Sequence, residues 1–389
     1  MKKWMSRNLI VLTLVSLAQD AASELLYPLL PYIITAGVIG AAPITLGLIE
    51  GCAEAAAGFT KLYSGKKSDS IGRKPFVIAG YSIAGVGKAL VIFGTLWSVV
   101  FLGRVTDRIG KGLRGAPRDA LIHDSVPQEH VGKAFGFHRT GDNIGAVLGP
   151  LIALLGLSLF NDDVRSVAKW ALIPALLSGL LTLFVKETVT QRKASVVKEP
   201  KVELPKPMKK AIAILVLIQL TNIPDALLLL RLYDLDFSVQ GVVLAYAFYS
   251  FVTVLFAFPG GYLADKFSPQ IVYATGLIAF AISYVLLGAT TNKSIAVLAL
   301  VIYGIFPALT DGVGKAWIAK LSLPEHRGRA QGVYQASMSF AVLGAGIWGG
   351  AFWSKGSTQP VLILAGVGAG LGAIYFGSRF FFERFAHRS

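Results

Sequence analysis

The feature that most constrains this chain is the repeated return of apolar segments about as long as a membrane is thick. A helix that crosses the hydrocarbon core of a bilayer needs roughly 20 mainly apolar residues. Such segments recur in two groups, at 9–34, 44–64, 76–96, 98–122, 130–157 and 164–186, and at 211–233, 239–262, 271–290, 295–320, 328–354 and 358–382. We therefore predict an all-α membrane protein with 12 transmembrane helices in two six-helix bundles, 1–186 and 211–389, joined by a cytoplasmic linker at 187–210.

The composition agrees with a chain that lies mostly in lipid. Hydrophobic residues make up 54% of it and charged residues 15%, against about 25% charged residues in a typical soluble domain. The net charge of +15 would indicate nucleic acid for a soluble protein. Because the cytoplasmic loops of membrane proteins collect Lys and Arg, we instead predict no nucleic-acid partner. The single cysteine, Cys52, excludes an intramolecular disulfide.

Basic residues are distributed unevenly between the polar segments. They gather before the first expected helix, after the second, in the linker and near the carboxyl end. The segment 35–43 has no Lys or Arg, and 291–294 has one. By the positive-inside rule, we expect both termini and the linker on the cytoplasmic side of the cell membrane. The first apolar run lacks a small-residue cleavage site, so we expect it to stay as a helix rather than be removed as a signal peptide.

The two halves of the sequence resemble each other at a constant offset. The stretch 65–69 shares its Gly and Asp with 261–265, and 130–136 shares its His, Gly, Ala and Gly with 326–332. Both pairs lie 196 positions apart. This indicates a tandem duplication, and therefore two pseudo-symmetric bundles. Repeats of this kind normally enclose a site near the middle of the bilayer.

The segment GKKSDSIGRKP, residues 65–75, follows the second expected helix. A glycine inside it permits a tight turn, and an Asp and an Arg four residues apart can form ion pairs that hold helix ends together. The segment resembles the loop motif of the major facilitator superfamily, with Lys67 and Ser70 in place of the usual Leu and Arg. The resemblance implies a conformational latch formed by Gly65, Asp69, Gly72, Arg73, Lys74 and, in the second copy, Asp265.

A second motif lies within the fifth expected helix. Gly136, Gly145, Gly149 and Pro150 follow the spacing G-x8-G-x3-G-P, which permits close helix approach and a local bend. The spacing is similar to a motif of antiporters in the same superfamily, mainly proton-coupled exporters. Ala153 and Leu154 stand where that motif often has two glycines. Ordinary packing of small residues between membrane helices is the alternative interpretation.

The segment RVTDRIGKGLRGAPRD, residues 104–119, contains the pattern G-x-G-x-x-G. A nucleotide loop of that kind needs a preceding strand, whereas this one lies in an expected membrane helix. At about 100° per residue, the charged side chains fall within an arc of roughly 140°: they are Arg104, Asp107, Arg108, Lys111, Arg114, Arg118 and Asp119. The resemblance places Arg104 at the buried arginine of the superfamily's fourth helix, whereas Arg108 replaces the usual glycine.

So many charges in a membrane helix require partners. We expect acids on the first, second and fifth helices to neutralise the bases, with Lys88 on the third helix as a further charge. The candidates for proton coupling are Asp20, Glu24, Glu50, Glu54, Asp107 and Asp142. The candidates for the substrate or charge network are Arg104, Arg108, Lys111, Arg114, His138, Arg139, Asn143, Asn222 and Asp225. Two interpretations stay open: a purely structural network, or one in which a carboxylate exchanges a proton.

The second half is less charged. Asp225 aligns roughly with Glu24, and Asp311 lies four residues before Lys315. The aromatic residues of 248–258 either line a cavity or, the interpretation we prefer, face lipid or the core. This asymmetry predicts coupling chemistry in the first half and an apolar substrate wall in the second.

The resemblance implies a transporter of the major facilitator fold that exports a small amphipathic molecule or metabolite by alternating access. We expect antiport driven by the proton gradient, with no cofactor, no bound metal, no catalytic residue and a monomeric state. One alternative is an exporter of divalent metal or other inorganic cations, with oxygen and imidazole ligands from Asp20, Glu24, Glu50, Glu54 and His138. Another is an organic-anion carrier that uses the basic face at 104–119. No nucleophile–base–orienter set indicates an enzyme.

Overall fold

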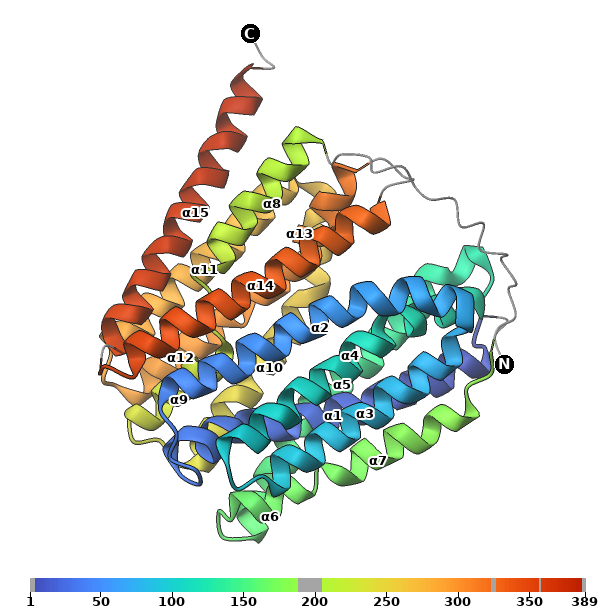
Figure 1. Cartoon of the computed structure of the whole chain (residues 1–389). Coiled ribbons are helices and arrows are strands. Elements are labelled where there is room, and N and C mark those ends of the chain that lie inside the picture. The colour runs from blue at the N-terminus through green and yellow to red at the C-terminus, as the bar shows by residue number, and fades with distance from the viewer. Residues whose placement is uncertain (1–3, 188–204, 323–326, 357, 387–389) are drawn as a thin grey trace. The chain divides into compact units, whose positions relative to one another are not determined.

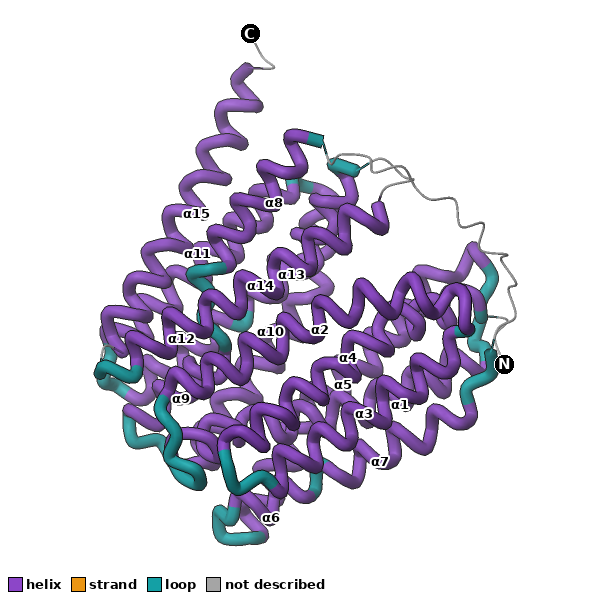
Figure 2. Tube along the Cα trace, viewed as in Figure 1, coloured by secondary structure: helices purple, strands orange, loops and turns teal. Residues whose placement is uncertain are grey.

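The computed structural model describes residues 4–187, 205–322, 327–356 and 358–386, in which every regular element is a helix (Figures 1 and 2). In the first half these are α1 (Arg7–Leu26), η1 (Tyr27–Leu29), η2 (Tyr32–Ala36), α2 (Pro43–Ile71), α3 (Arg73–Phe93), α4 (Trp97–Asp124), η3 (Gln128–His130), α5 (Val131–Leu159), α6 (Val164–Lys169), α7 (Leu172–Leu181) and η4 (Thr182–Phe184). In the second half they are α8 (Lys206–Gln219), α9 (Asp225–Asp234), α10 (Val239–Lys266), α11 (Pro269–Ala289), α12 (Lys293–Tyr303), α13 (Ile305–Lys320), α14 (Arg327–Trp353) and α15 (Thr358–Ala386).

Each expected span coincides with one helix or with consecutive helices. Within the described residues, nine helical segments are long and apolar enough to cross a membrane. The expected second and fourth spans, α2 and α4, are not among them, because their charged residues lower the mean hydropathy. The seventh falls on α8 and α9, which are only 14 and 10 residues long. The all-helical membrane class is confirmed, and the helix order is consistent with 12 spans.

The chain divides into two compact units. The first comprises Met1–Ala41 and Cys52–Val202, and the second Ala42–Gly51 and Glu203–Ser389. The boundary between the two units therefore falls within α2, between Gly51 and Cys52. Most of the predicted linker, 188–204, lies outside the described residues.

In the first unit, α3 and α4 run side by side, as do α1 and α5 (Figure 1). Glycines seven residues apart bring the backbones of α3 and α4 together. A Cβ atom added to Gly80 would lie 2.8 Å from the Gly110 carbonyl oxygen, and one added to Gly87 would lie 2.6 Å from that of Gly103. Seven residues are two helical turns, so each pair of glycines shares one face. Two glycines of the G-x-G-x-x-G pattern thus serve packing: Gly110 contacts α3, and Gly112 lies against the backbone of α2 at Ala57.

In the second unit, α11 packs against α12, α13 and α15, and α10 packs against α13. Large side chains fill this core: Phe280 and Tyr284 of α11 and Tyr303 of α12 are fully or almost fully buried. Tyrosine is an amphipathic side chain whose hydroxyl usually finds a hydrogen-bond partner when buried. The second unit therefore carries polar atoms in its core although it has few charges.

Candidate functional site

An enclosed ion-pair cluster lies on the face shared by α3 and α4. Lys88 Nζ is 2.5 Å from Asp107 Oδ1, and Arg104 Nη1 is 3.5 Å from Asp107 Oδ2. The side chains of Lys88, Asp107 and Arg104 are only 2%, 5% and 4% exposed. The close approach at Gly87 and Gly103 places Lys88 beside Asp107, and Arg104 also lies over the Tyr27 ring at 5.6 Å. Two bases hold one acid here, so Asp107 is fixed in a salt bridge.

A second pair joins α2 to α4 in a more open environment. Arg108 Nε lies 3.2 Å from Glu54 Oε1, and the Glu54 side chain is 34% exposed. The expectation that an acid of the second helix pairs with this base is thus met. Lys111, one turn further along α4, is exposed, and its charge interacts with those of Glu54 and Asp20. This part of the charged face is accessible, unlike the cluster at Asp107.

A histidine and an aspartate face each other on α5. His138 Nε2 and Asp142 Oδ1 are 3.7 Å apart, and both atoms are buried without a hydrogen-bond partner in the described part of the chain. On the other side of the ring, His138 Nδ1 lies 3.5 Å from Thr13 Oγ1 of α1. At 3.7 Å the two atoms are too far apart for a hydrogen bond, but one added proton would make their contact attractive.

The charged groups that act on Asp142 come from three helices: Asp20 of α1, Arg118 and Asp119 of α4, and Arg139 of α5. Arg118 donates from Nη1 to Ser16 Oγ at 3.0 Å and is ion-paired with Asp119 at 2.9 Å. The carboxylate of Asp142 is therefore surrounded by charges of both signs.

Arginines of α4 contact aromatic rings as well as acids. Arg114 lies over the Tyr81 ring of α3 at 4.5 Å, and the Tyr81 hydroxyl is 2.8 Å from Ser16 Oγ of α1. Such cation–π contacts strengthen where water is excluded. The sequence interpretation did not predict that Tyr81 and Tyr27 contact these arginines, because helical spacing orders side chains within one helix but does not tell which neighbour they face.

The loop motif forms the expected turn. Gly72 has φ of 110°, in the region that favours glycine. Arg73 pairs with Asp69 at 3.6 Å and also with Asp124 at the end of α4, which was not predicted. The Lys74 amide donates to Glu187 Oε2 at 2.8 Å, and Gly65 lies near α4. The segment therefore ties α2 and α3 to the end of α4 and to Glu187, which follows η4. The side chain of Asp265 in the second copy lies outside the described residues.

The glycine motif of α5 is correct in part. A Cβ atom on Gly149 would lie 2.6 Å from the Leu25 amide nitrogen, and one on Gly145 would lie 3.1 Å from that of Ala21, so both pack on α1. Gly136 was predicted to pack and does not, since nothing described lies within 4 Å of its Cβ position. Nine residues rotate a helix by about 180°, which puts Gly136 on the face opposite Gly145. Gly141, four residues before Gly145, packs on Thr13 instead.

Pro150 is buried within α5, which runs unbroken from Val131 to Leu159. Glu24 and Asn143 are half-buried on α1 and α5, and Arg139 is exposed. Glu50 is buried in the part of α2 that belongs to the second unit. The acids and His138 proposed as metal ligands do not converge, because no group of three His, Cys, Asp or Glu side chains in the described residues could hold a metal ion.

In the second unit, Asn222 and Asp225 are brought together by tyrosines. Tyr303 Oη is 2.8 Å from Asn222 Oδ1 and 2.9 Å from Asp225 Oδ1, and Tyr249 donates to Asp225 Oδ2 at 2.8 Å. The stretch 220–224 breaks the helix before Asp225, so this residue opens α9. The sequence interpretation placed Tyr249 among lipid-facing or core residues, and it is buried in the core, but the bond from its hydroxyl to the acid was not predicted.

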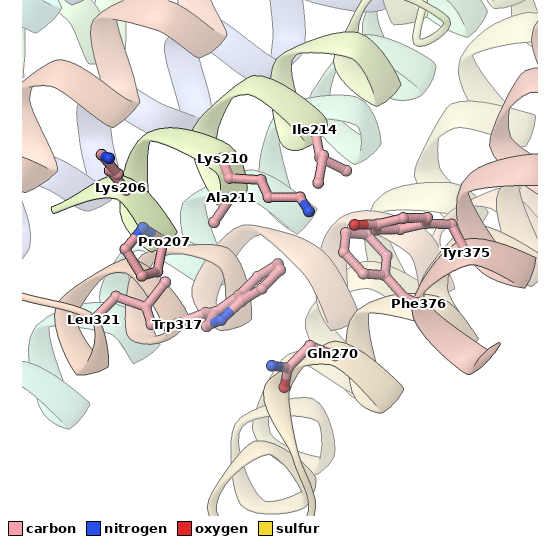
Figure 3. A pocket seen from close by; sticks show the side chains of 10 residues that line it. All are labelled: Lys206, Pro207, Lys210, Ala211, Ile214, Gln270, Trp317, Leu321, Tyr375 and Phe376. Carbon is pink, nitrogen blue, oxygen red and sulfur yellow. The ribbon is translucent and has the colours of Figure 1, made fainter. Parts of the chain in front are cut away.

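A separate cavity of about 450 Å³ lies between α8, α11, α13 and α15 (Figure 3). Its apolar wall includes Trp317, Phe376 and Ile214, and Lys206 and Lys210 reach it from α8. None of the predicted site residues lines it. It is distinct from the cluster at Asp225 and from the charged face of α4.

Comparisons with known proteins give the family. The family model described as Major Facilitator Superfamily matches residues 12–232 and again residues 211–388. The chain is 28% identical over 357 residues to an uncharacterized MFS-type transporter of Methanocaldococcus jannaschii, covering 90% of this chain and 89% of that protein. It is 31% identical over 191 residues to multidrug resistance protein MdtG of Serratia proteamaculans, covering 47% of this chain and 45% of that protein.

Among solved structures, the fold is similar to that of the nucleoside transporter NupG. The TM-score is 0.77 at 15% sequence identity, over 96% of this chain and 99% of that one. At this identity the similarity concerns the fold alone. The two matches of the family model, which together span residues 12–388, show that this chain is an integral membrane transporter that belongs to the major facilitator superfamily.

Proposed function

We propose that this transporter is a proton-coupled antiporter that exports a small amphipathic molecule or metabolite by alternating access. The proton gradient across the cell membrane is its energy source, and both termini and the linker are on the cytoplasmic side. The direction of transport is supported by the similarity to a multidrug resistance protein over about half of the chain and by Gly145, Gly149 and Pro150 at antiporter spacing.

The observation that carries the proton coupling is the pair His138 and Asp142. When His138 is neutral with its proton on Nδ1, a lone pair of Nε2 faces the carboxylate and the two repel each other. One added proton, on either group, makes the 3.7 Å contact attractive, and a closer approach of the two atoms would then form a hydrogen bond. The interaction between His138 and Asp142, which lie four residues apart on α5, therefore depends on a single proton.

The other acids of the first unit differ in what holds them. Asp107 is enclosed and has two bases, so release of its salt bridge would leave buried charges unpaired. Glu54 is paired with Arg108 and is partly open. We infer that Asp107 is structural, that Asp142 exchanges the proton, and that Glu54 is the second candidate for exchange.

Transport by purified protein in liposomes with an imposed pH gradient tests this proposal. Organic cations, organic anions and divalent metals are offered in one panel. Asp142→Asn and His138→Gln are expected to bind substrate but to lose accumulation driven by the pH gradient. The matched control is Asp163→Asn, an acid in the loop before α6. Full coupled transport by both α5 variants would refute the role of the pair.

One observation favours a second candidate, an organic-anion carrier. Lys111 is exposed on the charged face of α4, the expected fourth span, and no ion pair to it is found in the described residues. If the substrate is an anion, the panel will show transport of anions only, and Lys111→Gln will raise the substrate KM. If organic cations are transported and Lys111→Gln changes nothing, this candidate is wrong.

A further inference from the structure

With Asn222 Oδ1 facing the tyrosines, the cluster of three tyrosines around Asp225 contains more short oxygen–oxygen contacts than an ionised carboxylate explains. It is assembled from four helices of the second unit: Asp225 begins α9, and the tyrosines are Tyr249 of α10, Tyr284 of α11 and Tyr303 of α12. The rings of Tyr249 and Tyr303 are stacked, with centroids 5.6 Å apart. All three tyrosines are buried, so their hydroxyls have fixed surroundings.

The protons of these hydroxyls can be counted. Each hydroxyl has one proton to donate, whereas amide and carboxylate oxygens only accept. Tyr249 uses its proton on Asp225 Oδ2 at 2.8 Å. Tyr303 has one proton and two acceptors, Asn222 Oδ1 at 2.8 Å and Asp225 Oδ1 at 2.9 Å. With an ionised Asp225, one of these two contacts would place lone pairs against each other.

A proton on Asp225 Oδ1 resolves this conflict. The carboxyl group then donates to Tyr303 Oη, and Tyr303 donates to Asn222 Oδ1. The hydroxyl of Tyr284, 3.2 Å from both Asn222 Oδ1 and the Ile223 carbonyl oxygen, is satisfied by either acceptor. Every short contact of Asp225 and Tyr303 then contains one proton, and Asp225, Tyr303 and Asn222 form a continuous relay.

The surrounding charges also favour the neutral acid. Within the described residues, no basic side chain forms an ion pair with Asp225; its polar partners are the two tyrosine hydroxyls. Among the described residues, two further acids, Asp311 of α13 and Glu50 of α2, act on its charge. A carboxylate without a cation in low-dielectric surroundings is strongly disfavoured, and more so beside like charges.

We propose that Asp225 holds a proton in this conformation and is a second proton-exchange site, separate from His138 and Asp142. Its role in transport depends on the proposed proton coupling, but its protonation does not. Tyr303 and Asn222 act as positioning residues that accept and pass the hydrogen bond. An Asn222 amide turned to donate from Nδ2 would suit an ionised Asp225, and this is the arrangement with which the experiment contrasts the proposal.

Infrared spectroscopy of the purified full-length protein distinguishes the two arrangements. A protonated carboxyl group has a C=O stretching band that a carboxylate lacks. We expect such a band in the native protein, its loss in Asp225→Asn, and its retention in Asp234→Asn, a matched change at the other end of α9. Tyr303→Phe is expected to shift the band, because it removes the group to which the carboxyl group donates.

The proposal would be overturned if the native and Asp225→Asn spectra were identical, across the pH range, in the region of the C=O band of a protonated carboxyl group. If Asp225→Asn does not fold, the Tyr303→Phe spectrum decides: an unshifted band refutes the proposal. The liposome assay separates this result from the proposed function. A band at Asp225 in a protein that transports nothing on a pH gradient would refute the function alone, whereas coupled transport without the band would refute only the inference.

Discussion

Gly87 of α3 and Gly103 of α4 face each other so closely that a Cβ atom on the first would lie 2.6 Å from the carbonyl oxygen of the second. The residue after Gly87 is Lys88, and its ammonium group reaches Asp107 one turn beyond Gly103. The ion pair and the glycine contact are therefore parts of one arrangement. Without the backbone approach, the buried lysine would lack its acid.

Gly87→Val is expected to force α3 and α4 apart and to weaken the Lys88–Asp107 pair. Overpacking of a close contact costs about 1–3 kcal/mol, and the weakened ion pair adds to this. Thermal unfolding in detergent measures the effect. The matched control is Gly85→Val on the same helix, because nothing described lies within 4 Å of its Cβ position. Equal stability of the two variants would contradict the packing role of Gly87.

Asp107→Asn is expected to destabilise the protein by about 3–5 kcal/mol, since it leaves buried bases without their acid. Lys88→Met in the same background should restore part of this loss, because it removes one of the uncompensated charges. A double-mutant cycle on the unfolding free energies gives the coupling between the two residues. Additive effects would show that the 2.5 Å contact contributes nothing of its own.

The seam between α1 and α5 gives a test with an internal control. Gly145→Leu and Gly149→Leu should each lower yield and unfolding temperature, because the added side chain meets the α1 backbone. Gly136→Leu should leave both unchanged, since its Cβ position faces open space. A loss of stability in the Gly136 variant equal to that of the other two would show that the whole motif packs.

The ion pair between Arg73 and Asp124 connects the start of α3 to the end of α4. Both side chains are about one-fifth exposed, so solvent screens the pair and we expect a coupling free energy of about 1 kcal/mol or less. Unfolding of Arg73→Gln, Asp124→Asn and the double variant measures it. If the segment is also a conformational latch, the single variants will change the transport rate by more than they change stability.

Asp163 caps α6, and its contribution to the stability of the protein depends on pH and can be measured separately. Hydrogen bonds from the Ser166 side chain and backbone lower the pKa of Asp163 below its usual value. Because the folded-state pKa is depressed, this stabilisation is present above the unfolded-state pKa, about 4, and is lost as pH falls through the folded value. Asp163→Asn keeps the cap but should remove this dependence. If the unfolding temperature of Asp163→Asn falls with decreasing pH as much as that of the native protein, Asp163 is not the source of this dependence.

The fold could be predicted from the sequence because helix length and hydropathy are local properties. The expected spans fall on helices, and the turn at Gly72 is where spacing predicted it. An acid of the second helix was expected to pair with a base of the fourth, as Glu54 does with Arg108, although this particular pair was not named. We also expected the neutralising acids to come from the first, second and fifth helices, and this was incomplete: Asp107, which pairs with Arg104, lies on the same helix as its base.

What the sequence could not reveal is how neighbouring helices are rotated about their axes. Helical periodicity orders side chains within α4, but the rotation of α3 decides that Tyr81 lies under Arg114. The same limit applies to the second unit: Tyr249, Tyr284 and Tyr303 come from three separate helices, so periodicity could not tell that their hydroxyls meet around Asn222 and Asp225. Gly136 failed for a simpler reason, because the motif spacing does not keep it on the face of Gly145.

The change of unit within α2 has a practical consequence. Cys52 carries the only thiol of the chain and is the first residue after the boundary between the two units. Its side chain is partly accessible. A thiol-reactive fluorophore or spin label would therefore attach at a single position without removal of other cysteines. That position is where one helix passes from one compact unit to the other, so the native protein already has a reporter at its internal boundary.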